Sequence, residues 1–354
     1  MMNPLYVRVA SFVLLVMLSA CGAQSTSGVN EQITDNDQVV EKRTLVVYSG
    51  RSEALIKPII DAYMSTHPAV NVLLKAGKDN ELAATILEEK NAPQADVYIT
   101  TNFLTSLALA RDGVFEAHSV PNVAEIPAQY MSPEAMWTPI TLRARVLMYN
   151  TDQLTAEQAP TSIQALTDPK WAGRVAAANS TNGAMQAHIA TLITRTSSTA
   201  VQTLLTGLVK NNVTFFGGHT DVRKAVGSGE FAVGLVNHYY YELQKREPTD
   251  NKVGVIFPDQ AEGETGLVLN ATAASVVKGG PNTADAQDFV DFLLQPDTQK
   301  LFAELNFEYP IIPSVPLAEG VTPLTGLKIA AFSIADMEAQ VPAAQSLMAG
   351  AGIP

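Results

Sequence analysis

Short apolar runs alternate with segments of helical spacing along most of the chain. Residues 44–48 (TLVVY) have the length and composition of a buried strand, and the next apolar residues recur three and four positions apart between residues 55 and 64, as in an amphipathic helix. Further strands are predicted at residues 70–74, 95–99, 142–149, 174–178, 231–236, 253–257 and 272–277. Further helices are predicted at residues 81–90, 102–112, 183–194, 200–210, 221–228, 241–246, 283–294 and 297–304, with one or two more in 324–348. This repeated order predicts an α/β fold with parallel strands and helices on both faces of each sheet.

The length of the chain indicates more than one hydrophobic core. The sequence has 354 residues, of which 47% are hydrophobic and 16% charged, so it can bury a substantial core. A chain of this length is usually divided into compact parts. Two lobes are therefore predicted.

The N-terminal residues predict export. The apolar run Val9–Ala20 is too short to span a bilayer as a helix, but it suits the core of a secretory signal. It ends in Leu18-Ser19-Ala20-Cys21, which resembles the bacterial lipobox, so residues 1–20 are predicted as a lipoprotein signal peptide and Cys21 as the lipid-bearing first mature residue. An ordinary signal peptide with a chance cysteine is the alternative. Residues 21–43 are polar and predicted as a flexible tether, and a protein tied by lipid to the periplasmic or outer face of a membrane is expected.

Composition excludes several classes of function. With 23 Lys and Arg against 35 Asp and Glu, the net charge is −12, which argues against a nucleic-acid partner because phosphate neutralisation needs clustered basic residues. The single cysteine excludes an internal disulfide framework, and five scattered histidines without HExxH or CxxC make a structural zinc site unexpected. No GxSxG nucleophile motif is present, so a hydrolase is also disfavoured.

Five polar loops are candidates for a site at strand ends, and four of them directly follow predicted strands. The five loops are Ser49–Ser52, Thr100–Asn102, Asn179–Ala184, Gly217–Asp221 and Asn237–Tyr241. Because ligands bind beyond the carboxyl ends of strands in open α/β sheets, these loops are candidates for one binding site between the lobes.

The last of these loops contains three consecutive tyrosines, Tyr239, Tyr240 and Tyr241. Successive side chains diverge, so the three phenols cannot all enter one core. A phenolate is a hard oxygen ligand that suits a small, highly charged cation such as Fe³⁺, and the cation would stabilise the deprotonated form directly. The alternative is an aromatic cluster that covers a hydrophobic edge with its hydroxyls in water. Residue types alone leave both interpretations open.

Seven segments carry a family resemblance. They are LVVYSGRSEA, APQADVYITTNF, LRARVLMYNTDQL, DPKWAGRV, STNGAMQAHIATLI, VGSGEFAVGLVNHYYYELQKRE and QDFVDFLLQPDTQKLFAELNFEYPIIPSV. In order, spacing and the adjacent tyrosines, they resemble the periplasmic ferric-ion-binding proteins of ABC transporters, a branch of the two-lobed periplasmic binding proteins.

The resemblance implies two doubly wound sheets joined by a hinge. Lobe 1 is expected to contain residues 44–141 and 266–312, and lobe 2 residues 142–265 and 313–354. Hinge crossings are expected near Thr141–Leu142 and Gly266, with a third near Pro313.

The resemblance also implies roles for individual residues. Tyr239 and Tyr240 are expected to bind iron, with Tyr241 outside the metal shell. Residues expected on the anion or ligand side are Arg143, Arg145, Thr181, Asn182, Gly183, Ala184, Asn237 and His219, and those expected on the opposite lobe are Ser49, Arg51, Ser52 and Thr101. A guanidinium can hold carbonate or phosphate through two parallel bonds, and backbone N–H groups at a helix start attract anions. The alternative for either arginine of the Arg-x-Arg pair is a buried scaffold that pairs with an acidic residue.

Three positions depart from the family pattern. Many relatives have a histidine where this chain has Ser52, a glutamate where it has Thr101, and some a tyrosine where it has Ala184. A six-coordinate ion would then need a bidentate anion with water or a chelator. His219 and His238 are possible substitutes for the absent ligands, and Arg51 could hold an anionic chelate instead.

The expected function is therefore that of a lipid-anchored solute-binding protein that captures Fe³⁺ with a synergistic anion such as carbonate and delivers it to an ABC permease. Closure of two lobes around the ligand is the expected mechanism. A monomer is expected. The alternative is the same fold binding a small organic or phosphate-containing anion without metal, and an enzyme is disfavoured.

Overall fold

The computed structural model of the protein describes residues 42–331 and 334–354, which belong to one compact unit, Glu41–Pro354. The predicted signal peptide, Cys21 and all but the last two residues of the predicted tether lie outside the described residues. None of the described helices is long and apolar enough to cross a membrane.

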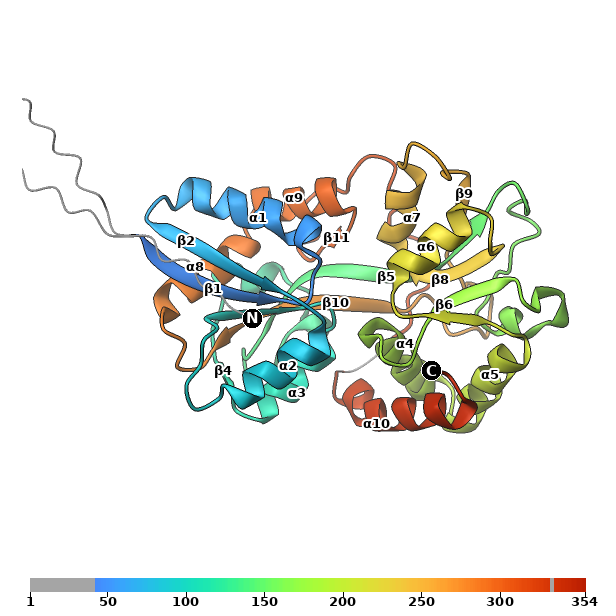
Figure 1. The fold of residues 1–354 in the computed structure, drawn as a ribbon, viewed down its shortest axis with the longest axis horizontal. Helices are drawn as coiled ribbons and strands as arrows, with labels where there is room; N and C mark the ends of the chain where they lie inside the picture. Colours follow the sequence, from blue (N-terminus) through green and yellow to red (C-terminus); the bar gives the residue numbers. More distant parts are fainter. Residues whose placement is uncertain (1–41, 332–333) are drawn as a thin grey trace, which may run out of the picture. The chain divides into compact units, whose positions relative to one another are not determined.

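The first sheet has three parallel strands at its outer edge. These are β1 (Arg43–Ser49), β2 (Val70–Ala76) and β3 (Val97–Thr100), with β1 paired to both others. Five helices cover the two faces of this sheet (Figure 1): α1 (Glu53–Thr66), α2 (Asp79–Glu88), α3 (Phe103–Arg111), α8 (Thr283–Leu293) and α9 (Pro296–Asn306). The helical spacing predicted for α1 is confirmed, because Ile56, Ile59, Ile60 and Tyr63 form its buried stripe.

The second sheet repeats this arrangement. Its strands are β6 (Val175–Ala178), β7 (Thr214–Phe216), β8 (Val233–Asn237) and β9 (Val253–Ile256), and β6 runs parallel to β7 and β8. The covering helices are α4 (Gly183–Arg195), α5 (Ser198–Lys210), α6 (His219–Gly227), α7 (His238–Lys245) and α10 (Ile334–Ala351). Short 3-10 turns occur at Val123–Glu125, Ala128–Tyr130, Gln164–Thr167 and Pro169–Trp171.

Two long central strands join the sheets (Figure 1). Strand β5 (Thr138–Asn150) pairs with β10 (Leu269–Val277) through residues 138–144 and with β8 through residues 145–149. The described strands consequently form one path, β2-β1-β3-β10-β5-β8-β6-β7, with β4 (Phe115–Glu116), β9 and β11 (Tyr309–Pro310) paired beside it. The register of β10 shifts at Thr272/Ala273, opposite Thr141, which is where the first hinge crossing is predicted.

Several element boundaries differ from the prediction. Strand β1 begins at Arg43, inside the predicted tether, because Arg43 pairs with Val70 and its guanidinium binds Asp285 at 2.8 Å. Strand β7 was not predicted. Helix α7 begins at His238 instead of Tyr241, so the tyrosines occupy a first helical turn and not a loop.

The two sheets do not have wholly separate cores. One hydrophobic cluster runs from β1 and α1 through β5 to α6, and a second lies around α4, α5 and α10. The backbone of Gly266 donates to Asp259, and its neighbour Leu267 pairs with Ile329, so Gly266 lies beside the C-terminal segment of the chain. Its role as a hinge stays a prediction.

Candidate ligand-binding site

A cavity of about 1210 Å³ opens between the carboxyl ends of the strands of both sheets. Twelve of the predicted site residues line it: Arg51, Ser52, Thr101, Arg143, Thr181, Asn182, Gly183, Ala184, His219, Asn237, Tyr239 and Tyr240. Ser49 and Arg145 are not among its lining residues. The hydroxyl of Ser49 accepts the backbone N–H of Arg51 at 3.2 Å, and Arg145 is fully buried on β5.

The tyrosine pair sits at the start of α7, where the buried strand β8 ends. The rings of Tyr239 and Tyr240 lie 4.2 Å apart between centroids at an angle of 32°. Tyr239 is buried, whereas Tyr240 is half-buried. Burial raises the pKa of Tyr239 well above its ordinary value of 10, and the Arg143 guanidinium, 5.0 Å from the ring, acts in the opposite direction. The two phenols therefore share one wall of the cavity.

Arg145 is a buried cation with only neutral hydrogen-bond partners. Its Nη1 donates to Nε2 of His219 at 2.8 Å and to the amide oxygen of Asn237 at 3.0 Å. Its Nε and Nη2 have no hydrogen-bond partner among the described residues. Burial lowers the pKa of Arg145 to about 9, and the nearby Tyr239 and Tyr240 counteract this when they carry charge. An anionic ligand or a phenolate would supply the missing counter-charge.

His219 is held in one tautomer by this contact. Because Arg145 donates to Nε2, the ring carries its proton on Nδ1. Burial and the adjacent Arg145 place the pKa of His219 well below its ordinary value, so the ring is neutral. It lies beside Tyr240, with ring centroids 5.4 Å apart, and thus forms part of the same wall.

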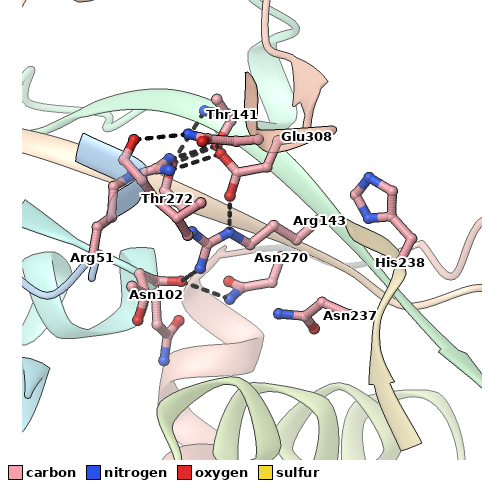
Figure 2. A network of polar contacts seen from close by, with 12 residues as sticks. Arg51, Asn102, Thr141, Arg143, Asn237, His238, Asn270, Thr272 and Glu308 are labelled. Atoms are coloured by element: carbon pink, nitrogen blue, oxygen red, sulfur yellow. Dashed lines mark hydrogen bonds and ion pairs between the residues drawn. The ribbon is translucent and has the colours of Figure 1, made fainter. Parts of the chain in front are cut away.

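The other arginine of the pair, Arg143, has a carboxylate partner. Figure 2 shows Arg143 and Arg51 converging on Glu308, with distances of 2.5 Å from Arg143 Nε and 2.8 Å from Arg51 Nη1. The hydroxyl of Thr141 also donates to Glu308 at 3.0 Å, and Arg51 Nη2 donates to the hydroxyls of Thr141 and Thr272 at 2.9 Å. Burial opposes the charge on Glu308, but the two guanidinium groups lower its pKa to about 2.

This network, which we call the Glu308 cluster (Arg51, Thr141, Arg143, Thr272 and Glu308), was not predicted. The alternative prediction for the Arg-x-Arg pair was a buried arginine that pairs with an acidic residue. Arg143 has this pairing, although it also lines the cavity. Arg51 lines the cavity as predicted for the opposite lobe, but its guanidinium binds within the cluster, whereas the sequence had suggested that it could hold an anionic chelate.

The predicted anion loop forms the start of α4. The side chain of Asn182 caps the helix by accepting the N–H of Met185 at 3.1 Å, and the Thr181 hydroxyl donates to Asn179 at 2.8 Å. Asn102, from the other sheet, donates to the carbonyl of Gly183 at 3.0 Å. The N-terminus of α4 thus faces the cavity at a point where the two halves touch.

The opposite wall contains a carboxylate that sequence reasoning missed. Asp79, the first residue of α2, lines the cavity and accepts the backbone N–H of Thr101 at 3.1 and 3.2 Å. The hydroxyl of Thr101 donates to the same carboxylate. Burial raises the pKa of Asp79, and the hydrogen bonds from Thr101 and the charge of Arg143 oppose this. Ser52, in contrast, is exposed and makes no side-chain cap for α1.

His238 does not face the cavity. Its Nδ1 accepts the backbone N–H of Ala144 at 3.1 Å, and its ring stacks on Tyr309 with centroids 4.2 Å apart. Burial lowers the pKa of His238 to about 3, so the ring is neutral. Among the residues that the structure describes, no three His, Cys, Asp or Glu side chains gather into a metal-binding group. A metal in this cavity would therefore depend on the phenols.

The fold and the cavity define a two-lobed α/β protein that binds a small ligand between its lobes. Residues 83–325 match the sequence pattern of the bacterial extracellular solute-binding proteins, and the chain belongs to this family.

Several relatives have names that refer to iron. The chain is 30% identical over 344 residues to iron uptake protein A1 of Synechocystis sp., a match that covers 95% of this chain and 93% of that protein. It is 27% identical to the Fe(3+)-binding periplasmic protein of Serratia marcescens, with 83% of each chain covered.

Solved structures agree with the fold. Trichodesmium FutA (IdiA) in complex with iron and citrate ligands gives a TM-score of 0.75 at 29% identity, and iron-bound HitA from Pseudomonas aeruginosa gives 0.81 at 26% identity. Each match covers 88% of this chain and 100% of the other. The predicted family and the two-lobed fold are confirmed. The family is one of solute-binding proteins and not of enzymes, as predicted.

Proposed function

We propose that this protein captures ferric iron together with a small anion and delivers it to an ABC permease for import. The observation that carries the proposal is the pair Tyr239 and Tyr240, whose ring centroids lie 4.2 Å apart on the wall of the interlobe cavity, together with Arg145, a nearby buried cation that has no acidic partner. The named iron proteins among its relatives support the same cargo.

Binding would couple metal capture to loss of two phenol protons. Fe³⁺ prefers hard anionic oxygen ligands, and its charge favours the phenolate forms despite the burial that raises the pKa of Tyr239. Once deprotonated, the phenolates also supply counter-charge to Arg145. A bidentate anion such as carbonate, or an organic acid that arrives with the iron, would occupy the space near Arg143 and the start of α4.

Lobe closure would then trap the cargo. The lobes proposed are residues 44–141 with 266–312 and residues 142–265 with 313–354, and they move about the central strands near Thr141. The ligand favours the closed state because only there do both walls contact it.

The protein would act as a monomer outside the cytoplasmic membrane, with lipid on Cys21 and the polar segment that precedes β1, predicted as residues 21–43, as a tether. A membrane permease then receives the closed, loaded form.

The test is titration of the purified mature protein with ferric and ferrous salts, with and without carbonate or citrate. Ferric iron should produce a visible phenolate-to-iron charge-transfer band, which ferrous iron does not, and Tyr240→Phe should remove most of it. A protein that stays colourless with every anion tried, and is instead stabilised against heat by a phosphate or an organic acid alone, would replace the iron assignment with that of an anion-binding protein.

A further inference from the structure

Three strand ends converge around the carboxylate of Asp79. Strands β2, β1 and β3 are parallel neighbours, so their carboxyl ends lie at one edge of the sheet. Asp79 follows β2, Gly50 follows β1 and Thr101 follows β3. All three residues line the cavity, on the wall opposite the tyrosine pair.

The carboxylate is held in place from two sides. Thr101 donates its backbone N–H to both oxygens at 3.1–3.2 Å, and its hydroxyl donates to Oδ2. A Cβ atom at Gly50 would lie 1.6 Å from Asp79 Oδ1 and 2.5 Å from Cγ, so only glycine leaves room for the carboxylate there. The residue is thus fixed at the cavity surface, and its position depends on neighbours from two other strands.

Asp79 is also a carboxylate without a paired cation. Buried Glu308, by contrast, pairs with Arg51 and Arg143. Asp79 forms no ion pair within the described part of the chain, and its neighbour Lys78 pairs with Glu81 instead. Thr101 supplies hydrogen bonds but no positive charge. Arg143, whose charge acts to lower the pKa of Asp79, forms its ion pair with Glu308. A partly buried anion of this kind is stabilised when a cation occupies the adjacent space.

We propose that Asp79 is a metal ligand of this protein, binding Fe³⁺ from the first lobe while Tyr239 and Tyr240 bind it from the second. This inference rests on the proposed function. Two phenolates and one carboxylate bring three negative charges to a trivalent ion, and two phenol protons leave on binding. In this arrangement Thr101 is the residue that positions the carboxylate.

A purely structural role for Asp79 predicts something different. In that case its carboxylate serves only to satisfy the N–H of Thr101, and the amide oxygen of asparagine could do the same. The substitution Asp79→Asn therefore separates the two roles, because it keeps the shape and an acceptor oxygen but removes the negative charge. Glu81→Gln is the matched control, since Glu81 is an exposed acid on the same helix.

The experiment measures ferric affinity and the position of the phenolate charge-transfer band for the wild type and both variants, with citrate as competitor. Asp79→Asn should weaken ferric binding about 10- to 100-fold. At saturation its band should move to longer wavelength, because a ferric ion without the carboxylate accepts phenolate electron density more readily. Glu81→Gln should match the wild type in both measurements.

The outcomes separate this inference from the proposed function. A wild type that shows no band contradicts iron binding itself. A wild type with a band and an Asp79→Asn protein of equal affinity and equal wavelength overturns the role of Asp79 while leaving iron binding intact. Weaker binding with an unchanged band at saturation and a lowered unfolding temperature of the iron-free variant would assign Asp79 a structural role only.

Discussion

Arg143 and Arg145 lie two residues apart on strand β5, and both are buried, yet their surroundings differ. Arg143 binds Glu308 at 2.5 Å within the Glu308 cluster, where two cations share one carboxylate. Arg145 has a neutral imidazole and a neutral amide as partners, and two of its nitrogens have none among the described residues. Arg143 thus has a carboxylate partner before a ligand arrives, whereas Arg145 has none. We infer that the Glu308 cluster holds the central strands together and that the surroundings of Arg145 are arranged for a ligand.

The largest expected effect is a loss of stability when the carboxylate of the Glu308 cluster is removed. Glu308→Gln would leave two buried guanidinium groups without a carboxylate and should lower the free energy of unfolding by about 3–5 kcal/mol. Denaturant unfolding of the iron-free protein measures this. A loss below about 1 kcal/mol would show that the cluster is not a stabilising element.

Acid should have a related effect. Because the pKa of Glu308 is lowered to about 2 from an ordinary value of 4.5, its carboxylate contributes stability that is fully present above about pH 4.5 and is lost as the pH falls toward 2. The contribution is about 3 kcal/mol. Between pH 6 and pH 2, the free energy of unfolding should fall more steeply for the wild type than for Glu308→Gln. Parallel curves would contradict the assignment.

The tyrosine pair should control affinity and not stability. Tyr239→Phe removes one anionic ligand and should weaken ferric binding by at least about 100-fold. Tyr241→Phe is the matched control, because Tyr241 is half-buried on the same helix and lines no part of the cavity. Equal loss in both variants would point to a general disturbance of α7.

The comparison of the two arginines is sharpest in Arg145→Met. An uncompensated buried charge gives little stability, so the free energy of unfolding of the iron-free protein should change by less than about 1 kcal/mol or rise. Ferric affinity should nevertheless fall about 10- to 100-fold, since the phenolates lose their counter-charge. Arg143→Met should instead destabilise the iron-free protein, because Glu308 loses one of its two cations. Identical behaviour of the two variants would remove the distinction drawn between them.

Local patterns predicted most of the fold. Most strands and helices were predictable because a helical spacing or a continuous apolar run is visible within a few residues, as in α1 and β5 respectively. Strand β7 has only three residues, too few to show a pattern. Helix α7 begins earlier than predicted because His238 and Tyr239 gain burial in the folded protein, which outweighs the modest helix propensity of histidine and tyrosine.

The site was predictable only in part. The adjacent tyrosines and the loops after the strands could be found because they are contiguous in sequence. Arg51 and Glu308 are 257 positions apart, so no local pattern indicated that the two side chains would form an ion pair. Asp79 meets Thr101 because the parallel strands β2, β1 and β3 end at the same edge of the sheet, and this strand order is not visible in the periodicity of the chain. The Gly77-Lys78-Asp79 segment after β2 was a detectable signal, since it too follows a strand.

The central claim is that two neighbouring phenols bind the ferric ion directly, and resonance Raman spectroscopy of the iron-loaded protein tests it most directly. Excitation in the visible band should enhance the ring and C–O vibrations of iron-bound tyrosinate, and Tyr239→Phe with Tyr240→Phe should abolish them. Iron that binds with comparable affinity to the wild type but shows no tyrosinate vibrations would contradict the account.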